Sequence, residues 1–260
     1  MIKITSLDSD KKTNRHIIFI PGGPGLSSLT LRTMDILKRS FHLHYIDFPG
    51  TNGNPYLKDS TYEELVDELI SALKEKFKDK KDELIVAGHS FGGFFAADLA
   101  IKMKLKGLVC IAVPFSGDSL QAVEVCYDKK RNGDLLKSEE EWIKKQDDES
   151  LAKWFSHYGE LYFLNPSGKE LILKDPVSAK FFIANREDAS RGEDLLLDLE
   201  DVKCPKLFIL GESDGLLPSD ILVEDARAGG FALFEIENAS HFVTFDQPER
   251  VASLLEKYLS

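Results

Sequence analysis

Long apolar runs are absent from the sequence, and cysteine is scarce. No stretch approaches the roughly 20 apolar residues that a transmembrane helix requires. The first twelve residues, MIKITSLDSDKK, are too polar for a secretion signal. The three cysteines, Cys110, Cys126 and Cys204, are far apart and match no metal-ligand spacing. We therefore expect a protein of the reducing cytoplasm that binds neither a membrane nor a metal.

Positive charge is also in short supply. The chain has 33 lysines and arginines against 44 aspartates and glutamates, a formal net charge of −11. This balance argues against binding to nucleic acid or to an anionic membrane surface. We find neither internal repeats nor a low-complexity linker. A chain of 260 residues is long enough for one α/β core with a sizeable insertion, and its oligomeric state cannot be inferred.

Short apolar segments alternate with helical patterns along most of the chain. This alternation predicts a mostly parallel sheet with helices on its faces. Thr61 is the expected N-cap of the first long helix. The expected strands are 16–20, 41–46, 83–87, 107–113, 206–210 and 231–236, and the expected helices are 62–77, 94–103 and 248–258.

The pattern becomes helical and charged between residues 115 and 198. We expect a helical cap there, inserted into a core formed by residues 1–114 and 199–260. A capping box is expected at Ser138 to Glu141. The segment is rich in aromatic residues and has 18 acidic against 12 basic side chains, so it should favour neutral or cationic substrates over anionic ones. The cap residues expected to contact substrate are Trp154, Phe155, Tyr158 and Phe163.

One serine stands among three glycines after the expected strand 83–87. Residues 88–92 read GHSFG, which matches G-x-S-x-G at a strand-to-helix junction. This context predicts a tight turn that exposes Ser90, with the N–H groups of the next helix directed at negative charge developing on a substrate. A glycine-rich turn with an incidental serine is the alternative that the motif alone leaves open.

A serine nucleophile needs a base, and the base needs a group that orients it. Asp214 and His241 follow the last two expected strands, so both should lie at the same sheet edge as Ser90. Ser, Asp, His is the order in which α/β-hydrolases carry their triads. Asp47 and Asp246 are rival acids; we expect Asp47 to be structural and Asp246 to begin the last helix.

The remaining histidines have simpler interpretations. His89 adjoins the nucleophile and should point away from it, either packing behind the turn or bonding a backbone carbonyl. His157 lies among the aromatic residues of the expected cap, where packing is the first interpretation and substrate contact the second. Structural roles are expected for His16, His42 and His44.

Four stretches together resemble α/β-hydrolases of the capped esterase and proline-iminopeptidase type. They are FIPGGPG at 19–25, GHSFGG at 88–93, GESDGLLP at 211–218 and SHFVTFDQPERV at 240–251. The resemblance implies the α/β-hydrolase fold and a triad of Ser90, His241 and Asp214. It also implies an oxyanion hole formed by the N–H groups of Gly23 and Phe91, with no metal or organic cofactor.

The resemblance further implies a serine hydrolase that cleaves a small carboxylic ester or related acyl compound through an acyl-enzyme. Pro21 stands where the iminopeptidase pattern has histidine, and His89 and Phe91 replace the usual glycine and tryptophan beside the serine, which favours an esterase. An iminopeptidase would need acidic cap residues such as Glu160 or Asp175 to hold a free amine. Outside the enzymes, the alternative is a ligand-binding receptor with the same fold. In each case the expected partner is a small molecule.

Overall fold

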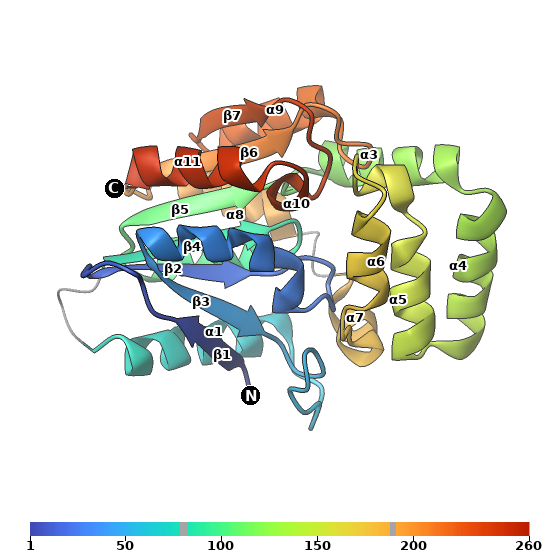
Figure 1. The fold of residues 1–260 in the computed structure, drawn as a ribbon, viewed down its shortest axis with the longest axis horizontal. Coiled ribbons are helices and arrows are strands. Elements are labelled where there is room, and N and C mark those ends of the chain that lie inside the picture. Colours follow the sequence, from blue (N-terminus) through green and yellow to red (C-terminus); the bar gives the residue numbers. More distant parts are fainter. Residues whose placement is uncertain (79–82, 188–190, 260) are drawn as a thin grey trace.

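The computed structural model describes residues 1–78, 83–187 and 191–259; residues 79–82 of the expected core, 188–190 of the expected cap and residue 260 lie outside this range. A seven-stranded sheet with the order β1-β3-β2-β4-β5-β6-β7 forms its centre (Figure 1). β1 pairs antiparallel with β3, and the other pairs are parallel. The strands are β1 (Lys3–Leu7), β2 (Arg15–Ile20), β3 (His42–Asp47), β4 (Glu83–His89), β5 (Gly107–Ile111), β6 (Lys206–Gly211) and β7 (Ala232–Ile236). The expected α/β-hydrolase sheet is confirmed.

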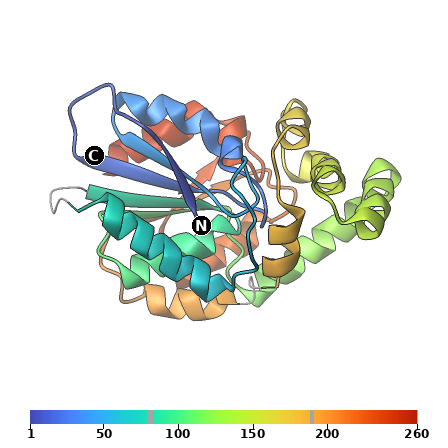
Figure 2. The ribbon, with the colours of Figure 1, turned by 90° about the horizontal axis from the view of Figure 1, so that it is seen from below.

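Both faces of the sheet are covered because side chains on a strand alternate between its faces. In β2, Ile17 and Phe19 pack into one cluster, whereas Ile18 and Ile20 pack into the other. Figure 2 shows the resulting three layers. One face is covered by η1 (Ser28–Arg39), α10 (Val243–Asp246) and α11 (Pro248–Leu259), and the other by α1 (Tyr62–Lys76), α2 (Gly92–Lys102), α8 (Gly192–Leu199) and α9 (Ser219–Ala228).

The first long helix begins as expected. Thr61 caps α1 by accepting the N–H of Glu64, whose carboxylate accepts the N–H of Thr61 in return. Leu65, Leu69 and Leu73 are fully or almost fully buried, so the spacing of four residues does place one apolar face against the sheet.

Most of the helices between β5 and β6 lie beyond the carboxyl ends of the strands. Figure 1 shows α4 to α7 past the arrowheads of β2 and β3. The last helix of this region, α8, instead packs on α2 of the core. The helices of the region are α3 (Gly117–Lys130), α4 (Gly133–Lys145), α5 (Asp148–Ser156), η2 (Gly159–Leu161), α6 (Gly168–Leu173), α7 (Ala179–Asn185) and α8.

The capping box expected at Ser138 is wrong. α4 begins five residues earlier, at Gly133, so Ser138 lies inside the helix. Its hydroxyl donates to the carbonyl of Leu135 (2.9 Å), as serines inside helices commonly do. The capping box of this region is formed by Asp147 and Ser150 at the start of α5.

Neither β1 nor η1 was predicted from the sequence. β1 is a half-exposed edge strand without an apolar run, and η1 is a long 3-10 segment whose tighter turn does not produce the α-helical spacing. Within the described ranges, no helix is both long enough and apolar enough to cross a membrane.

Candidate active site

Ser90 lies in a tight turn between β4 and α2. Its φ of +49° places it in the left-handed region, which residues with a Cβ seldom adopt. The N–H of Ser90 donates to the carbonyl of Ile111 on β5 (2.8 Å), and its carbonyl accepts the N–H of Gly93 (2.8 Å). This backbone conformation is strained, and strain of this kind is frequent where a side chain must be presented to a ligand.

The neighbouring glycines allow three backbone segments to meet at this turn. A Cβ on Gly88 would overlap the carbonyl of Gly92, and a Cβ on Gly92 would overlap the carbonyl of Ile20. A Cβ on Gly93 would overlap the side chain of Val113. The glycines are therefore required by close packing of α2 against the ends of β2, β4 and β5.

Asp214 and His241 meet as the sequence predicts. Nδ1 of His241 donates to Oδ2 of Asp214 (3.0 Å), and both side chains are almost completely buried. The other carboxylate oxygen, Oδ1, accepts the N–H groups of Leu216 and Leu217 (2.9 Å each). These two loop donors fix the carboxylate, and the carboxylate fixes the imidazole.

His89 and Tyr162 hold His241 from two sides. Nε2 of His89 donates to the backbone carbonyl of His241 (3.1 Å), so His89 bonds a carbonyl, one of its two expected roles. Burial lowers the pKa of His89 to about 3, which keeps the ring neutral. The ring of Tyr162 stacks on that of His241 with centroids 5.6 Å apart. The carbonyl bond links the nucleophile turn directly to the loop that carries His241.

A cavity of about 220 Å³ opens beside Ser90. Gly23 and Phe91 line it, and neither backbone N–H donates a hydrogen bond to another described residue. Both residues line the same cavity as Ser90, and the two N–H groups stay the predicted donors of an oxyanion hole. The remaining lining residues are Pro24, Phe94, Pro114, Leu120, Val123, Phe155, Tyr158, Tyr162, Phe182, Arg186, Leu216 and Leu217.

Of the four aromatic residues expected to contact substrate, the structure places two in the lining of the cavity and two outside it. Phe155 and Tyr158 line the cavity, whereas Trp154 and Phe163 are not among its lining residues. Trp154 donates through Nε1 to the hydroxyl of Tyr127 (2.8 Å), inside the helical segment. Phe163 stacks on Phe242, with centroids 4.6 Å apart. Packing inside the helical segment thus accounts for Trp154, and packing against the core accounts for Phe163.

Sequence reasoning missed several residues that line the cavity. Tyr162 belongs to the same aromatic run and could have been found from it. Leu216 and Leu217 directly follow Asp214, in the quoted stretch GESDGLLP. Phe182 and Arg186, on α7 and just after it, lie in no motif, and only tertiary structure brings them to the cavity.

The rival carboxylates have other partners. Asp47 accepts the N–H of Ser28 (2.9 Å) and the side-chain amide of Asn52 (2.9 Å). Asp246 ends α10 and does not begin the last helix, which starts at Pro248. The carboxylate of Asp246 accepts the N–H groups of Leu164, Asn165 and Ser240, all within 3.2 Å.

The two carboxylates that could hold a substrate amine do not line the cavity. Glu160 is exposed and forms an ion pair with Lys130 (2.9 Å). Asp175 is buried, and its two oxygens accept the N–H (2.8 Å) and the hydroxyl of Ser27. Neither carboxylate is placed to meet a ligand beside Ser90.

Asp175 instead joins the helical segment to the loop that carries Gly23. Asp175 and Asp47 accept the consecutive N–H groups of Ser27 and Ser28 at the start of η1, and Ser178 donates to the carbonyl of Gly25 (2.9 Å). Burial is the main cause that raises the pKa of Asp175 to about 6, with the nearby Asp47 adding to it.

This pKa predicts a pH-dependent stability. Because the folded pKa is above the ordinary value near ~3.9, the folded state binds the proton more tightly and loses stability as pH rises from about 4 to 6. Two pKa units correspond to about 3 kcal/mol. Asp175→Asn cannot ionise, so the stability of the wild type relative to this variant should fall by roughly that amount between pH 4 and pH 7.

Urea unfolding of both proteins at several pH values measures this difference. The exposed Asp128 provides a control, since Asp128→Asn should run parallel to the wild type. A constant difference between the wild type and Asp175→Asn across the range would contradict a raised pKa at Asp175.

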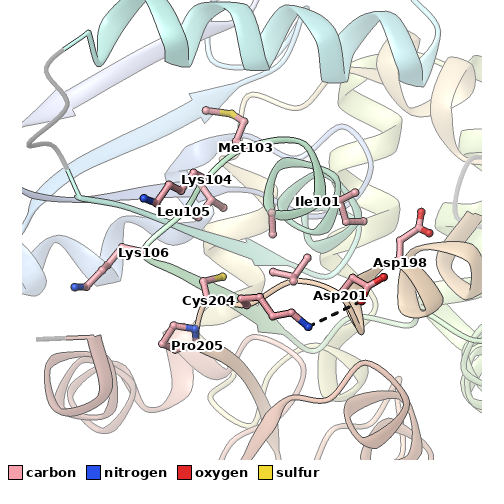
Figure 3. A pocket seen from close by; sticks show the side chains of 12 residues that line it. Ile101, Met103, Lys104, Leu105, Lys106, Asp198, Asp201, Cys204 and Pro205 are labelled. Carbon is pink, nitrogen blue, oxygen red and sulfur yellow. Dashed lines mark ion pairs between the residues drawn. The ribbon is translucent and has the colours of Figure 1, made fainter.

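A larger hollow of about 590 Å³ lies at the opposite end of the strands (Figure 3). It is lined by residues that precede β5 and β6, including Lys104, Lys106 and Cys204. Burial raises the pKa of the Cys204 thiol, which disfavours the reactive thiolate. An ion pair joins Lys203 to Asp201 (3.9 Å). This hollow does not assemble a nucleophile, a base and an acid, so the candidate active site is the smaller cavity at Ser90.

Comparison with known proteins agrees with this fold. The model of the alpha/beta hydrolase family matches residues 17–254. The chain therefore belongs to the alpha/beta hydrolase family, and the prediction of a hydrolase is confirmed at the level of the family. An esterase from Thermogutta terrifontis has a similar structure, with a TM-score of 0.74, 18% identity, and coverage of 99% of this chain and 92% of that one.

Two curated relatives match shorter regions. A serine carboxypeptidase-like protein from Arabidopsis thaliana is 33% identical over 96 residues, covering 34% of this chain and 50% of the relative. The proline iminopeptidase PfmaB from Pestalotiopsis fici is 30% identical over 88 residues, covering 33% of this chain and 31% of the relative. The chain thus spans half or less of the length of these relatives.

Proposed function

We propose that this protein is a serine esterase that hydrolyses small carboxylic esters or related acyl compounds. Ser90 is the nucleophile, His241 the base, and Asp214 the acid that orients and stabilises the imidazolium. The observation that carries the proposal is the buried hydrogen bond from Nδ1 of His241 to Asp214, at the sheet edge where Ser90 is presented. The similarity of the fold to that of the esterase from Thermogutta terrifontis also supports the proposal.

Acylation begins with attack of the Ser90 hydroxyl oxygen on the ester carbonyl. Nε2 of His241 takes the serine proton, and Asp214 stabilises the positive imidazolium that forms. The carbonyl oxygen becomes an oxyanion, which the N–H groups of Gly23 and Phe91 bind. The intermediate then collapses, His241 returns its proton to the leaving alcohol, and the acyl group remains on Ser90.

Deacylation repeats these steps with water as the nucleophile. His241 removes a proton from the water, the same two N–H groups bind the second oxyanion, and the carboxylic acid leaves as Ser90 recovers its proton. The helices past the strand ends act in this proposal as a cap over residues 1–114 and 199–260. Phe155 and Tyr158 form part of its apolar wall. Trp154 and Phe163 support the wall from behind.

An aminopeptidase of the proline-iminopeptidase type is the second candidate, favoured by the match to PfmaB. Such an enzyme binds a free amine, which calls for a carboxylate in the cavity. Among the described lining residues none is acidic, and this observation favours the ester. A panel of 4-nitrophenyl esters and prolyl and alanyl arylamides separates the two, since esters should be cleaved much faster.

A fluorophosphonate probe tests the nucleophile without knowledge of the substrate. Incubation with the full chain, followed by peptide mapping, should place the label on Ser90, because only an activated serine reacts with this electrophile. Ser90→Ala protein is the control and should remain unlabelled. Folded wild-type protein that resists the probe would favour the non-catalytic receptor instead.

A further inference from the structure

Among the residues that the structure describes, one charged side chain lines the cavity beside Ser90. Arg186 follows the last residue of α7 and lies in the cavity wall with Phe182 of the same helix. Among the described lining residues, the other polar side chains are those of Ser90, Tyr158 and Tyr162, and the rest are apolar or glycine. Arg186 is exposed to solvent, so it can keep its charge while its side chain lines an otherwise apolar cavity.

Arg186 differs from every other arginine in the chain. Within residues 1–78, 83–187 and 191–259, it is the one arginine with no carboxylate at ion-pair distance. The seven paired arginines and their partners are Arg15 with Glu83, Arg32 with Asp35, Arg39 with Glu249 and Glu256, Arg131 with Glu139, Arg191 with Glu63, Arg227 with Glu224, and Arg250 with Glu237. Its guanidinium is therefore available to an anion from outside the chain.

The neighbouring phenols are available as well. The hydroxyls of Tyr158 and Tyr162 hydrogen-bond to no other described residue. Burial raises the pKa of both phenols well above the ordinary value, so both remain protonated donors at neutral pH. One guanidinium and two neutral donors in a single apolar cavity suit a small molecule with one anionic group.

We propose that Arg186 binds a carboxylate on the substrate, so that the preferred substrates are small esters with one free carboxylate. A planar guanidinium donates two parallel hydrogen bonds to a carboxylate, which gives orientation as well as attraction. The inference rests on the proposed function, because it assigns a substrate class to the same site. It also opposes the preference for neutral or cationic substrates expected from the net charge of the helical segment.

The local cation should outweigh the net charge of the segment. Exposed charges are screened beyond roughly 8 Å at physiological salt. The excess acidic residues are spread over α3 to α8, whereas Arg186 lines the cavity itself. At close range the interaction with the nearest charge dominates, because the Coulomb energy falls with distance.

The size of the cavity limits the acyl group. At about 30 Å³ for each water-sized group, a volume of about 220 Å³ holds roughly seven such groups. An acyl chain of about five carbons that ends in a carboxylate fits this volume. The glutaryl group is the probe we select.

The test compares two esters that differ at one end. In 4-nitrophenyl hydrogen glutarate a carboxylate replaces the terminal methyl of 4-nitrophenyl valerate. We expect Arg186→Gln to lower the ratio of kcat/KM for the glutarate ester to kcat/KM for the valerate ester by roughly ten-fold. This is the lower range for a hydrogen bond to a charged group, and we choose it because Arg186 is exposed to solvent. Arg186→Lys should give an intermediate ratio, and added salt should lower the wild-type ratio.

Arg131→Gln is the matched control. It removes one positive charge from the same helical segment, but Arg131 is paired with Glu139 and is not a lining residue of the cavity. Its ratio should equal that of the wild type. A ratio that Arg186→Gln leaves unchanged would overturn the proposal. A ratio that both variants lower equally would also overturn it and would make net charge the determinant.

A binding measurement keeps this inference separate from the proposed chemistry. Glutarate is titrated calorimetrically into Ser90→Ala protein, and Arg186→Gln in that background should raise the Kd roughly ten-fold. Binding that requires Arg186, together with a wild-type protein that the fluorophosphonate does not label, would reject the esterase and keep the carboxylate site. Equal Kd values for the two proteins would reject the carboxylate site whatever the labelling result.

Discussion

Ser90→Ala should lower kcat by about a million-fold, the scale on which loss of a triad nucleophile acts in serine hydrolases. The substitution removes the hydroxyl that forms the acyl-enzyme and keeps the Cβ, so the strained turn is neither relieved nor worsened. The melting temperature should therefore stay close to that of the wild type. The measurement is the rate of ester hydrolysis by purified variant, with thermal unfolding as the test of folding.

The exposed Ser213, in the loop that carries Asp214, provides a matched control. Ser213→Ala loses the same hydroxyl from the same end of the sheet and should retain wild-type activity. If a folded Ser90→Ala protein kept more than about 1% of kcat, the nucleophile would have to be another group.

Asp214→Asn should lower kcat by roughly ten-thousand-fold with little change in KM. The N–H groups of Leu216 and Leu217 both point at Oδ1, so the amide oxygen of asparagine must take that position. Its NH₂ group then faces Nδ1 of His241 and donates to it. The imidazole proton is thereby forced onto Nε2, which can no longer accept the proton of Ser90.

Asp246→Asn is the control for this prediction, since Asp246 was the rival acid and its carboxylate accepts three backbone N–H groups, whereas the imidazole of His241 bonds Asp214. It should alter stability more than kcat. Steady-state kinetics of both variants settle the assignment: a large fall in kcat for Asp246→Asn and a small one for Asp214→Asn would reverse the two roles.

The sequence predicted the positions of Asp214 and His241 better than it predicted the walls of the cavity. Ser90, Asp214 and His241 each follow a strand that its own residues define, and a parallel sheet brings such strand ends to one edge. The bond between Nδ1 of His241 and Asp214 agrees with that reasoning. Local pattern therefore suffices where the sheet itself positions the residue.

The cavity walls depend on how separate helices pack, and no local pattern encodes that. Trp154 and Phe155 are adjacent in α5, yet only Phe155 lines the cavity. Arg186 lies in no motif, and it stands out only because, in the described part of the chain, the other arginines have a carboxylate partner and it does not. The prediction of a capping box at Ser138 was wrong because α4 begins at Gly133, so the capping-box sequence lies inside the helix.

Because the backbone at Ser90 is left-handed, thermal stability and catalytic activity favour different residues at this position. Glycine adopts this conformation without strain, whereas a residue with a Cβ pays about 1 kcal/mol or more. Random mutagenesis with selection for survival on heating alone would therefore enrich glycine at position 90 and discard the nucleophile. The same experiment could locate a reactive serine in a hydrolase of unknown substrate. Selection on heating would enrich glycine at that position, whereas a screen for turnover would reject glycine there.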